Sequence, residues 1–243
     1  MKRSIIYPVI SENLSLVREG IHSACVNAGR NPQEITVVAI SKGRVLGQIE
    51  EAIALGIHNI GESKVQEALP KYNALRAPQG VMWHMVGRLQ TNKVKDAVGI
   101  FDLIHSLDSL RLALEINRQA GRLGKVQDVL VEIKTSPEEA KSGLGPDEAP
   151  EAIKQMAELK NINIQGLMTI APQADNPERA RPYFRMLRKL QDKINAKRDT
   201  HNALHILSMG MSGDFQIAIE EGATMVRLGR AIFEGQDKCS ALE

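Results

Sequence analysis

Apolar and polar positions along the chain follow two alternating periods. Apolar residues recur at helical spacing over residues 11–29, 46–56 and 63–76, and a short apolar run follows each of these segments. The first run, residues 35–42, is rich in β-branched side chains and ends in Lys42. A run of this kind is typical of a strand that is buried on both faces, as in a parallel sheet covered by helices. The pattern therefore predicts strands that alternate with helices.

The alternation continues to the end of the chain. Eight strand candidates cover residues 35–42, 58–61, 81–87, 101–106, 126–134, 162–170, 204–209 and 224–228. Strands separated by helices form βαβ units, whose strands are parallel. Eight units in 243 residues favour an α/β fold with a single (β/α)8 TIM barrel and an additional N-terminal helix. An open sheet stays possible because periodicity does not report closure. No linker interrupts the series, so residues 1–243 are predicted to form one domain.

Capping residues predict where several helices begin. Asp108 is expected to cap the helix after strand 101–106, and a further helix is expected over residues 89–98. Pro150 is expected in the first turn of its helix, and Asn176 with Pro177 is expected to open a long one.

Charge and composition exclude several classes of partner. The chain carries 31 basic and 29 acidic residues, and aromatic residues make up only 3%, so neither nucleic acid nor an anionic membrane is expected as a partner. No apolar run approaches the ~20 residues that span a bilayer. Cys25 and Cys239 match no metal-ligand spacing and are interpreted as reduced thiols. These features predict a soluble cytoplasmic protein without a metal site.

The carboxyl ends of the predicted strands are where an α/β barrel places its chemistry. Lys42 ends the first strand, and its amine could form an imine with an aldehyde. The alternative is that Lys42 is only a charged residue where a strand reaches water. The stretch alone does not decide between these interpretations.

Two turns after the seventh and eighth strands are candidates for a phosphate site. Residues 208–214 are rich in glycine and hydroxyl groups, and residues 229–231 open a short helix. Barrels often hold phosphate in these two loops, where glycine lets backbone N–H groups approach an anion. A plain connection is the alternative for each turn. The candidate residues are Ser208, Gly210, Met211, Ser212, Gly229 and Arg230.

A lysine on one side of the rim and a phosphate site opposite it form the arrangement that pyridoxal phosphate needs. Arg227 could face the pyridine nitrogen, where a cation would disfavour protonation of the ring and weaken it as an electron sink. A salt bridge from Arg227 to a barrel carboxylate such as Glu62 is the alternative.

Seven motifs in order along the chain resemble the pyridoxal phosphate homeostasis proteins, the YggS/PROSC-like family. They are Ala39-Ile40-Ser41-Lys42, Ile60-Gly61-Glu62 with Val65-Gln66-Glu67, the segment 83–87 with 89–93, Lys141-Ser142-Gly143, Gly166-Leu167-Met168, the segment 207–212, and the segment 226–233. The family is similar to the N-terminal barrel of alanine racemase. The resemblance implies that Lys42 is the cofactor lysine, that residues 208–212 and 229–230 bind the phosphate, and that Arg227 faces the ring nitrogen.

The chain departs from the family pattern at three positions near the expected site. Ser63 stands where the family usually has asparagine, Arg230 where it has threonine or serine, and Arg44 where it often has a second lysine. His84 is either a general base or a hydrogen-bonded histidine lining the barrel. Lys141 either contacts solvent only or accepts the cofactor transiently.

Three functions are compatible with these features. The favoured one is a carrier that holds pyridoxal phosphate as a Schiff base on Lys42 and supplies apo-enzymes without catalysing a reaction itself. The second is an amino-acid racemase of alanine racemase type, which needs a second base; the resemblance implies a tyrosine from a separate domain that is not expected in this chain. The third is a sugar-phosphate enzyme that uses Lys42. A monomer is expected.

Overall fold

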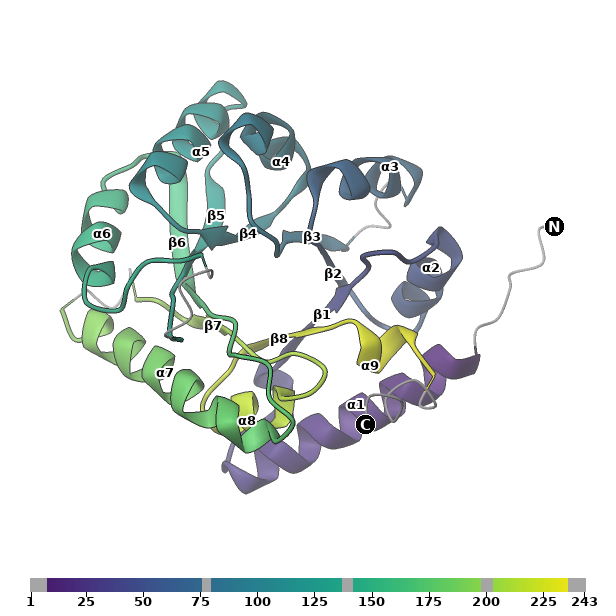
Figure 1. Cartoon of the computed structure of the whole chain (residues 1–243). Helices are drawn as coiled ribbons and strands as arrows, with labels where there is room; N and C mark the ends of the chain where they lie inside the picture. The colour runs from purple at the N-terminus through teal and green to yellow at the C-terminus, as the bar shows by residue number, and fades with distance from the viewer. Residues whose placement is uncertain (1–7, 76–79, 137–141, 198–202, 236–243) are drawn as a thin grey trace.

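The strands form a closed parallel barrel in chain order. The computed structural model describes residues 8–75, 80–136, 142–197 and 203–235 (Figure 1). Pairing of the first strand with the last, from Thr36 opposite Met225 to Ala39 opposite Leu228, closes the barrel. The strands are β1 (Thr36–Ile40), β2 (Asn59–Glu62), β3 (Met82–Met85), β4 (Leu103–Leu107), β5 (Gln127–Glu132), β6 (Ile162–Met168), β7 (Ile206–Ser208) and β8 (Met225–Leu228). The predicted (β/α)8 barrel is confirmed.

Helices surround the barrel, and an additional helix precedes β1 as predicted. In Figure 1 this first helix, α1, runs along the outside of the molecule beside α8 and α9, against which it packs. The helices are α1 (Pro8–Asn27), α2 (Leu46–Ala54), α3 (Val65–Leu75), α4 (Val94–Ile100), α5 (Leu110–Arg122), α6 (Ala149–Met156), α7 (Arg181–Asn195), α8 (Phe215–Glu220) and α9 (Arg230–Phe233). No helix among the described residues is long and apolar enough to cross a membrane.

Two hydrophobic cores follow from the alternation of side chains along the strands. The larger core lies between the strands and the helices and contains Ala39, Trp83 and Met85. Trp83 meets Tyr72 of α3 edge to face, with ring centroids 5.8 Å apart, so Trp83 and Met85 face the helix layer as expected. A smaller cluster inside the barrel consists of Val38, Leu103, Leu130, Met168 and Met225.

Several predicted boundaries shift in the structure. The predicted helix over residues 89–98 is split into a 3₁₀ turn, η2 (Thr91–Lys93), and α4. Asn176 caps a 3₁₀ turn, η3 (Pro177–Ala180), through a 2.9 Å bond from the Glu178 N–H, and the long helix α7 begins only after it. Pro150 lies in the first turn of α6 as predicted.

The predicted helix cap at Asp108 is wrong by one residue. Ser109 is the N-cap of α5, and its hydroxyl accepts a 3.3 Å hydrogen bond from the Leu112 N–H. Asp108 instead accepts a 2.9 Å bond from the Ser109 hydroxyl. The backbone of Ser109 is extended, as an N-cap requires, and this is not visible in a sequence in which two good caps adjoin.

We expect Ser109→Ala to lower the free energy of unfolding by about 1 kcal/mol, because it leaves an N–H group at the start of α5 without its side-chain partner. Urea unfolding followed by circular dichroism measures this loss. Asp108→Ala is the matched control and should cost less. An equal or larger loss in Asp108→Ala would contradict the assignment of the cap.

Candidate functional site

Lys42 lies at the carboxyl end of β1, just beyond a firmly held residue. The Ser41 N–H donates to the Gly61 carbonyl at 2.9 Å, and the Ser41 hydroxyl donates to Oε1 of Glu62 at 2.7 Å. Ser41 is fully buried, whereas Lys42 is exposed. Gly43 then turns the chain with a φ of +70°. Lys42 is thus exposed to solvent, and the backbone that precedes it is held in place.

A buried ion pair restrains the carboxyl end of β1. Lys71 of α3 pairs with Glu62, which is fully buried, and its Nζ also donates to the Ser41 carbonyl at 2.6 Å. The backbone carbonyl, backbone N–H and side chain of Ser41 all have partners. The residue before Lys42 is therefore restrained in every direction in which it could hydrogen-bond.

The residues after Lys42 are tied to the carboxyl end of α9. Arg44 forms an ion pair with Glu234, and its guanidinium lies 5.7 Å from the centroid of the Phe233 ring. Asn13 of α1 donates to the Ile232 carbonyl at 3.1 Å and to the Glu234 carbonyl at 2.7 Å. The position where the family often has a second lysine is thus occupied here by an arginine that joins the Lys42 turn to α9.

The loop after β7 is built around Gly210. Its φ is +92°, and a Cβ at this position would lie 2.6 Å from the Ala218 Cβ, so only glycine fits. The Met211 N–H donates to Oδ1 of Asp214 at 2.6 Å, and the Gly210 carbonyl accepts from the Arg227 N–H at 3.0 Å. These bonds fix the backbone of the loop over the end of β8.

The loop after β7 and the turn after β8 meet, as the sequence predicted. The hydroxyl of Ser212 accepts a 3.1 Å bond from the Ala231 N–H in the first turn of α9. A Cβ on Gly229 would contact the Ile40 Cβ at 3.5 Å, so this turn also lies against the end of β1. Arg230 is exposed beside it. The turns that carry the phosphate candidates thus lie on the same side of the barrel mouth as the Lys42 strand.

Ser208 differs from the other phosphate candidates. It is fully buried, and its hydroxyl accepts from Nη1 of Arg227 at 2.7 Å and lies 3.0 Å from Nδ1 of His105. This placement puts the Ser208 hydroxyl in the barrel interior, and its assignment to the phosphate stays a prediction. Ser208 ends β7, and strand alternation turns its side chain into the barrel interior.

Arg227 is buried inside the barrel without a salt bridge to Glu62. Its Nη2 donates to the Thr169 carbonyl at 2.9 Å, and only 4% of the residue is exposed. Burial lowers the pKa of Arg227 to about 10, while the carboxyl groups of Asp214 and Glu132 act in the opposite direction. The guanidinium therefore remains a cation at neutral pH. Glu62 is paired with Lys71 instead.

Two histidines continue the polar interior across the barrel. Nδ1 of His84 lies 3.0 Å from Nε2 of His105, and Nε2 of His84 lies 3.0 Å from Oδ1 of Asn59. Both histidines are buried, which supports the interpretation of His84 as a barrel-lining residue. The sequence reasoning missed His105, although Leu103, two residues earlier on β4, faces the interior.

These histidines make the fold sensitive to acid. Burial lowers the pKa of His84 to about 4 and that of His105 well below its usual range. Below pH ~6.5 these histidines bind protons in the unfolded chain but stay neutral in the folded one. Their contribution to the free energy of unfolding is therefore full above pH ~6.5 and falls as the pH drops toward 4. We expect a loss of about 1.4 kcal/mol per pH unit from His84 in this window. Urea unfolding at several pH values measures it, and an unchanged slope in His84→Asn would contradict it.

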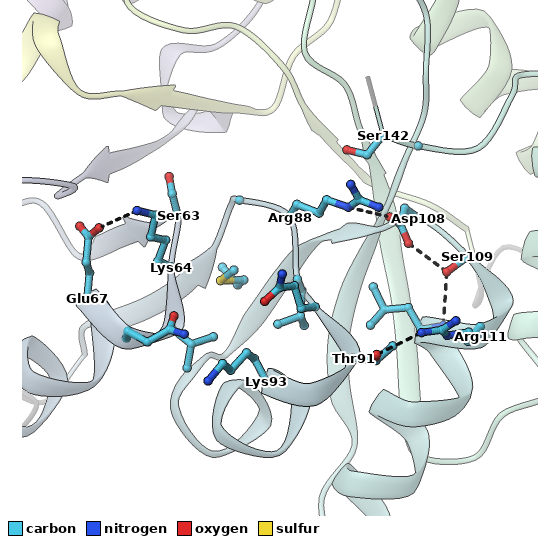
Figure 2. A pocket seen from close by; sticks show the side chains of 18 residues that line it. Ser63, Lys64, Glu67, Arg88, Thr91, Lys93, Asp108, Ser109, Arg111 and Ser142 are labelled. Atoms are coloured by element: carbon cyan, nitrogen blue, oxygen red, sulfur yellow. Dashed lines mark hydrogen bonds and ion pairs between the residues drawn. The ribbon is translucent and has the colours of Figure 1, made fainter. Parts of the chain in front are cut away.

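A pocket of about 1380 Å³ opens beside the site on the β2–β4 side of the mouth. Figure 2 shows its polar lining, in which Lys64 pairs with Glu67 at 3.6 Å and Arg88 approaches Asp108 at 4.0 Å. Its lining includes neither Lys42 nor the two phosphate turns. The pocket also includes Ser142, whereas Lys141, for which solvent contact alone and transient acceptance of the cofactor were both left open, lies outside the described residues.

Known proteins resemble this chain over nearly its whole length. The family model for the alanine racemase N-terminal domain matches residues 26–237. A pyridoxal phosphate homeostasis protein of Aquifex aeolicus is 47% identical over 222 residues, which are 91% of this chain and 96% of that protein.

Two solved structures share the fold. The structure of PipY from Synechococcus elongatus with pyridoxal phosphate bound has a TM-score of 0.81 and 33% identity, covering 92% of this chain and 99% of that one. An unknown protein from Bifidobacterium adolescentis has a TM-score of 0.89 and 34% identity, covering 95% and 98%. The chain belongs to the pyridoxal phosphate homeostasis protein family, which shares the barrel of the alanine racemase N-terminal domain.

Proposed function

We propose that this chain binds pyridoxal 5′-phosphate as a Schiff base on Lys42 and acts as an intracellular carrier that supplies apo-enzymes. The observation that carries the proposal is the convergence of an exposed lysine at the end of β1 with the two glycine turns after β7 and β8. The names of the relatives, and the cofactor in the PipY structure, support the same ligand.

The two turns suit a phosphate group. The backbone at Gly210 has no room for a Cβ, and N–H groups that open a helix favour an anion. At α9 the Ala231 N–H bonds to Ser212 and those of Ile232 and Phe233 bond to the Gly229 carbonyl, which leaves the Arg230 N–H for a ligand. Gly229 leaves the backbone open to an anion, and the exposed Arg230 adds a positive charge that compensates for the hydroxyl of the usual threonine or serine. We assign Gly210, Met211, Ser212, Gly229 and Arg230 to the phosphate.

Arg227 is compatible with a carrier. When bound, pyridoxal phosphate supplies an aldehyde for a lysine and a ring that withdraws electrons when its nitrogen is protonated. Arg227 remains a cation at neutral pH and opposes that protonation. Holding the cofactor without activating it is the behaviour expected of a carrier.

The described tyrosines offer no second base for racemisation. Tyr72 packs against Trp83 in the helix layer, and Tyr183 of α7 packs partly buried against the larger core between the strands and the helices. The curated relatives are named homeostasis proteins, which supports a non-enzymatic role. A soluble cytoplasmic monomer fits this role, and sedimentation of the loaded protein tests the oligomeric state.

Spectroscopy of the purified protein tests the proposal. Adding pyridoxal phosphate should produce a visible absorption band, and borohydride should fix the cofactor to a single peptide that contains Lys42. Incubation of the loaded protein with L-alanine in deuterated water should give no racemisation and no exchange at the α-carbon. A protein that stays colourless would contradict cofactor binding, and rapid exchange would favour the racemase.

Delivery to other proteins needs a separate measurement. The loaded protein is mixed with an apo-enzyme that depends on pyridoxal phosphate, in the presence of a trap for free aldehyde. A carrier should restore the activity of the enzyme despite the trap, whereas free cofactor at the same concentration should not. Equal inhibition of both sources by the trap would contradict direct delivery.

A further inference from the structure

A chain of five polar side chains crosses the barrel interior beneath the proposed cofactor site. Successive hydrogen-bonding atoms are 2.7–3.0 Å apart, and the residues come from β8, β7, β4, β3 and β2. In order they are Arg227, Ser208, His105, His84 and Asn59. The rings of the two histidines cross at 76° with centroids 5.2 Å apart, so they meet edge to face rather than stack.

The residues at the two ends of this hydrogen-bonded chain determine which atom donates and which accepts at each link. A guanidinium only donates, so Ser208 must accept from Arg227. The Ser208 hydroxyl is fully buried, and Nδ1 of His105 at 3.0 Å is the acceptor within its reach. His105 therefore carries its proton on Nε2 and donates to Nδ1 of His84.

The same reasoning continues to the other end. With Nδ1 of His84 accepting, its proton lies on Nε2 and is donated to Oδ1 of Asn59. The reverse direction would require Nδ1 of His105 to donate to Ser208, which would leave the buried Ser208 hydroxyl hydrogen without an acceptor. A charged His105 would leave the Ser208 hydroxyl hydrogen without an acceptor in the same way, and a charged His84 would either set its Nδ1–H against the Nε2–H of His105 or force the reverse direction. Only one proton arrangement satisfies every member.

We propose that His84 and His105 are positioning residues that hold the Arg227 guanidinium in one orientation through this one-way chain. Ser208 and the Thr169 carbonyl take one Nη group each, which fixes the plane of the guanidinium. Since the proposed function places Arg227 against the ring nitrogen of the cofactor, the inference about cofactor binding rests on that function. The direction of the chain does not depend on it.

Nitrogen NMR of the histidine rings in the cofactor-free protein tests the direction. Both rings should show an unprotonated Nδ1 and a protonated Nε2 at pH 7, with the signals assigned through His84→Asn and His105→Asn. A proton on Nδ1 of either ring, or a charged ring, would overturn the proposal. This experiment is decisive even if the protein binds no cofactor.

Two substitutions of His105 by side chains of similar size test whether this residue affects cofactor binding. His105→Asn places an amide oxygen near the position of Nδ1 and keeps an acceptor for Ser208, whereas His105→Leu removes it. We expect His105→Leu to bind pyridoxal phosphate roughly fivefold more weakly and to shift its visible band, with His105→Asn closer to the wild type. If His105 served only in packing, leucine would be tolerated at least as well as asparagine, and that result would overturn the inference. Failure of the wild type to bind the cofactor would instead contradict the proposed function.

Discussion

We expect Lys42→Ala to abolish the visible band of the bound cofactor and its fixation by borohydride. The reason is chemical: the Schiff base needs a primary amine, and the proposed site places the Lys42 amine beside both phosphate turns. The phosphate turns remain in the variant, so weak non-covalent binding of pyridoxal phosphate should persist. Absorption spectra before and after borohydride, with mass spectrometry of the intact protein, measure both effects.

The fold should tolerate this substitution. Lys42 is exposed, and its loss should change the free energy of unfolding by no more than about 0.5 kcal/mol. Lys64→Ala is the matched control, because Lys64 is an exposed lysine just beyond the end of β2, with 65% of its side chain accessible. Lys64→Ala should keep the full band. A borohydride-reducible adduct in Lys42→Ala would show that another lysine carries the cofactor.

Most of the fold and the position of Lys42 follow from periodicity. The strand runs are mostly apolar, because one face packs on helices and the other faces the barrel interior, and eight such runs limit the topologies. Glycine and serine in the last two loops then indicate where an anion can approach the backbone. These patterns involve residues that are close together in the sequence, so a single sequence is enough to recognise them.

The buried polar contacts could not be predicted in the same way. The direction of a side chain depends on register, and the pairing of β4 with β5 shifts between Ile104 and Leu107. The alternation of side chains along a predicted strand therefore could not show that His105 contacts Ser208, which is 103 residues away. Arg44 and Glu234 are 190 residues apart, and neither carries a motif that indicates the other. Contacts of this kind depend on the closed barrel.

Lys71 is the clearest example of a residue that the sequence hides. It lies within the helical pattern of α3, one residue after Pro70, and nothing in the pattern distinguishes it from a solvent-exposed lysine. In the fold it pairs with the fully buried Glu62 and also binds the carbonyl of Ser41, the residue before Lys42. Oε2 of Glu62 has no hydrogen-bond partner among the described residues. Lys71 is the cation that pairs with this carboxylate, whose Oε1 also accepts from the Ser41 hydroxyl.

We expect Lys71→Met to lower the free energy of unfolding by about 3–5 kcal/mol, because it leaves a buried carboxylate without its cation. Urea unfolding followed by circular dichroism measures the loss. The control Lys64→Met removes a lysine whose ion pair with Glu67 is solvent-exposed, and it should cost less than about 1 kcal/mol.

The double variant Lys71→Met/Glu62→Gln separates the charge from the packing. Without a carboxylate to bury, it should recover much of the stability that Lys71→Met loses, since a buried ion pair contributes little net stability once both charges are removed. In the double variant the Ser41 carbonyl still loses the hydrogen bond from Nζ of Lys71. The double variant should therefore hold pyridoxal phosphate more weakly than the wild type even when fully folded. Stability as low as that of Lys71→Met would show that packing around the lysine stem, rather than an uncompensated charge, causes the loss. Undiminished cofactor binding would show that Lys71 supports the fold without positioning Lys42.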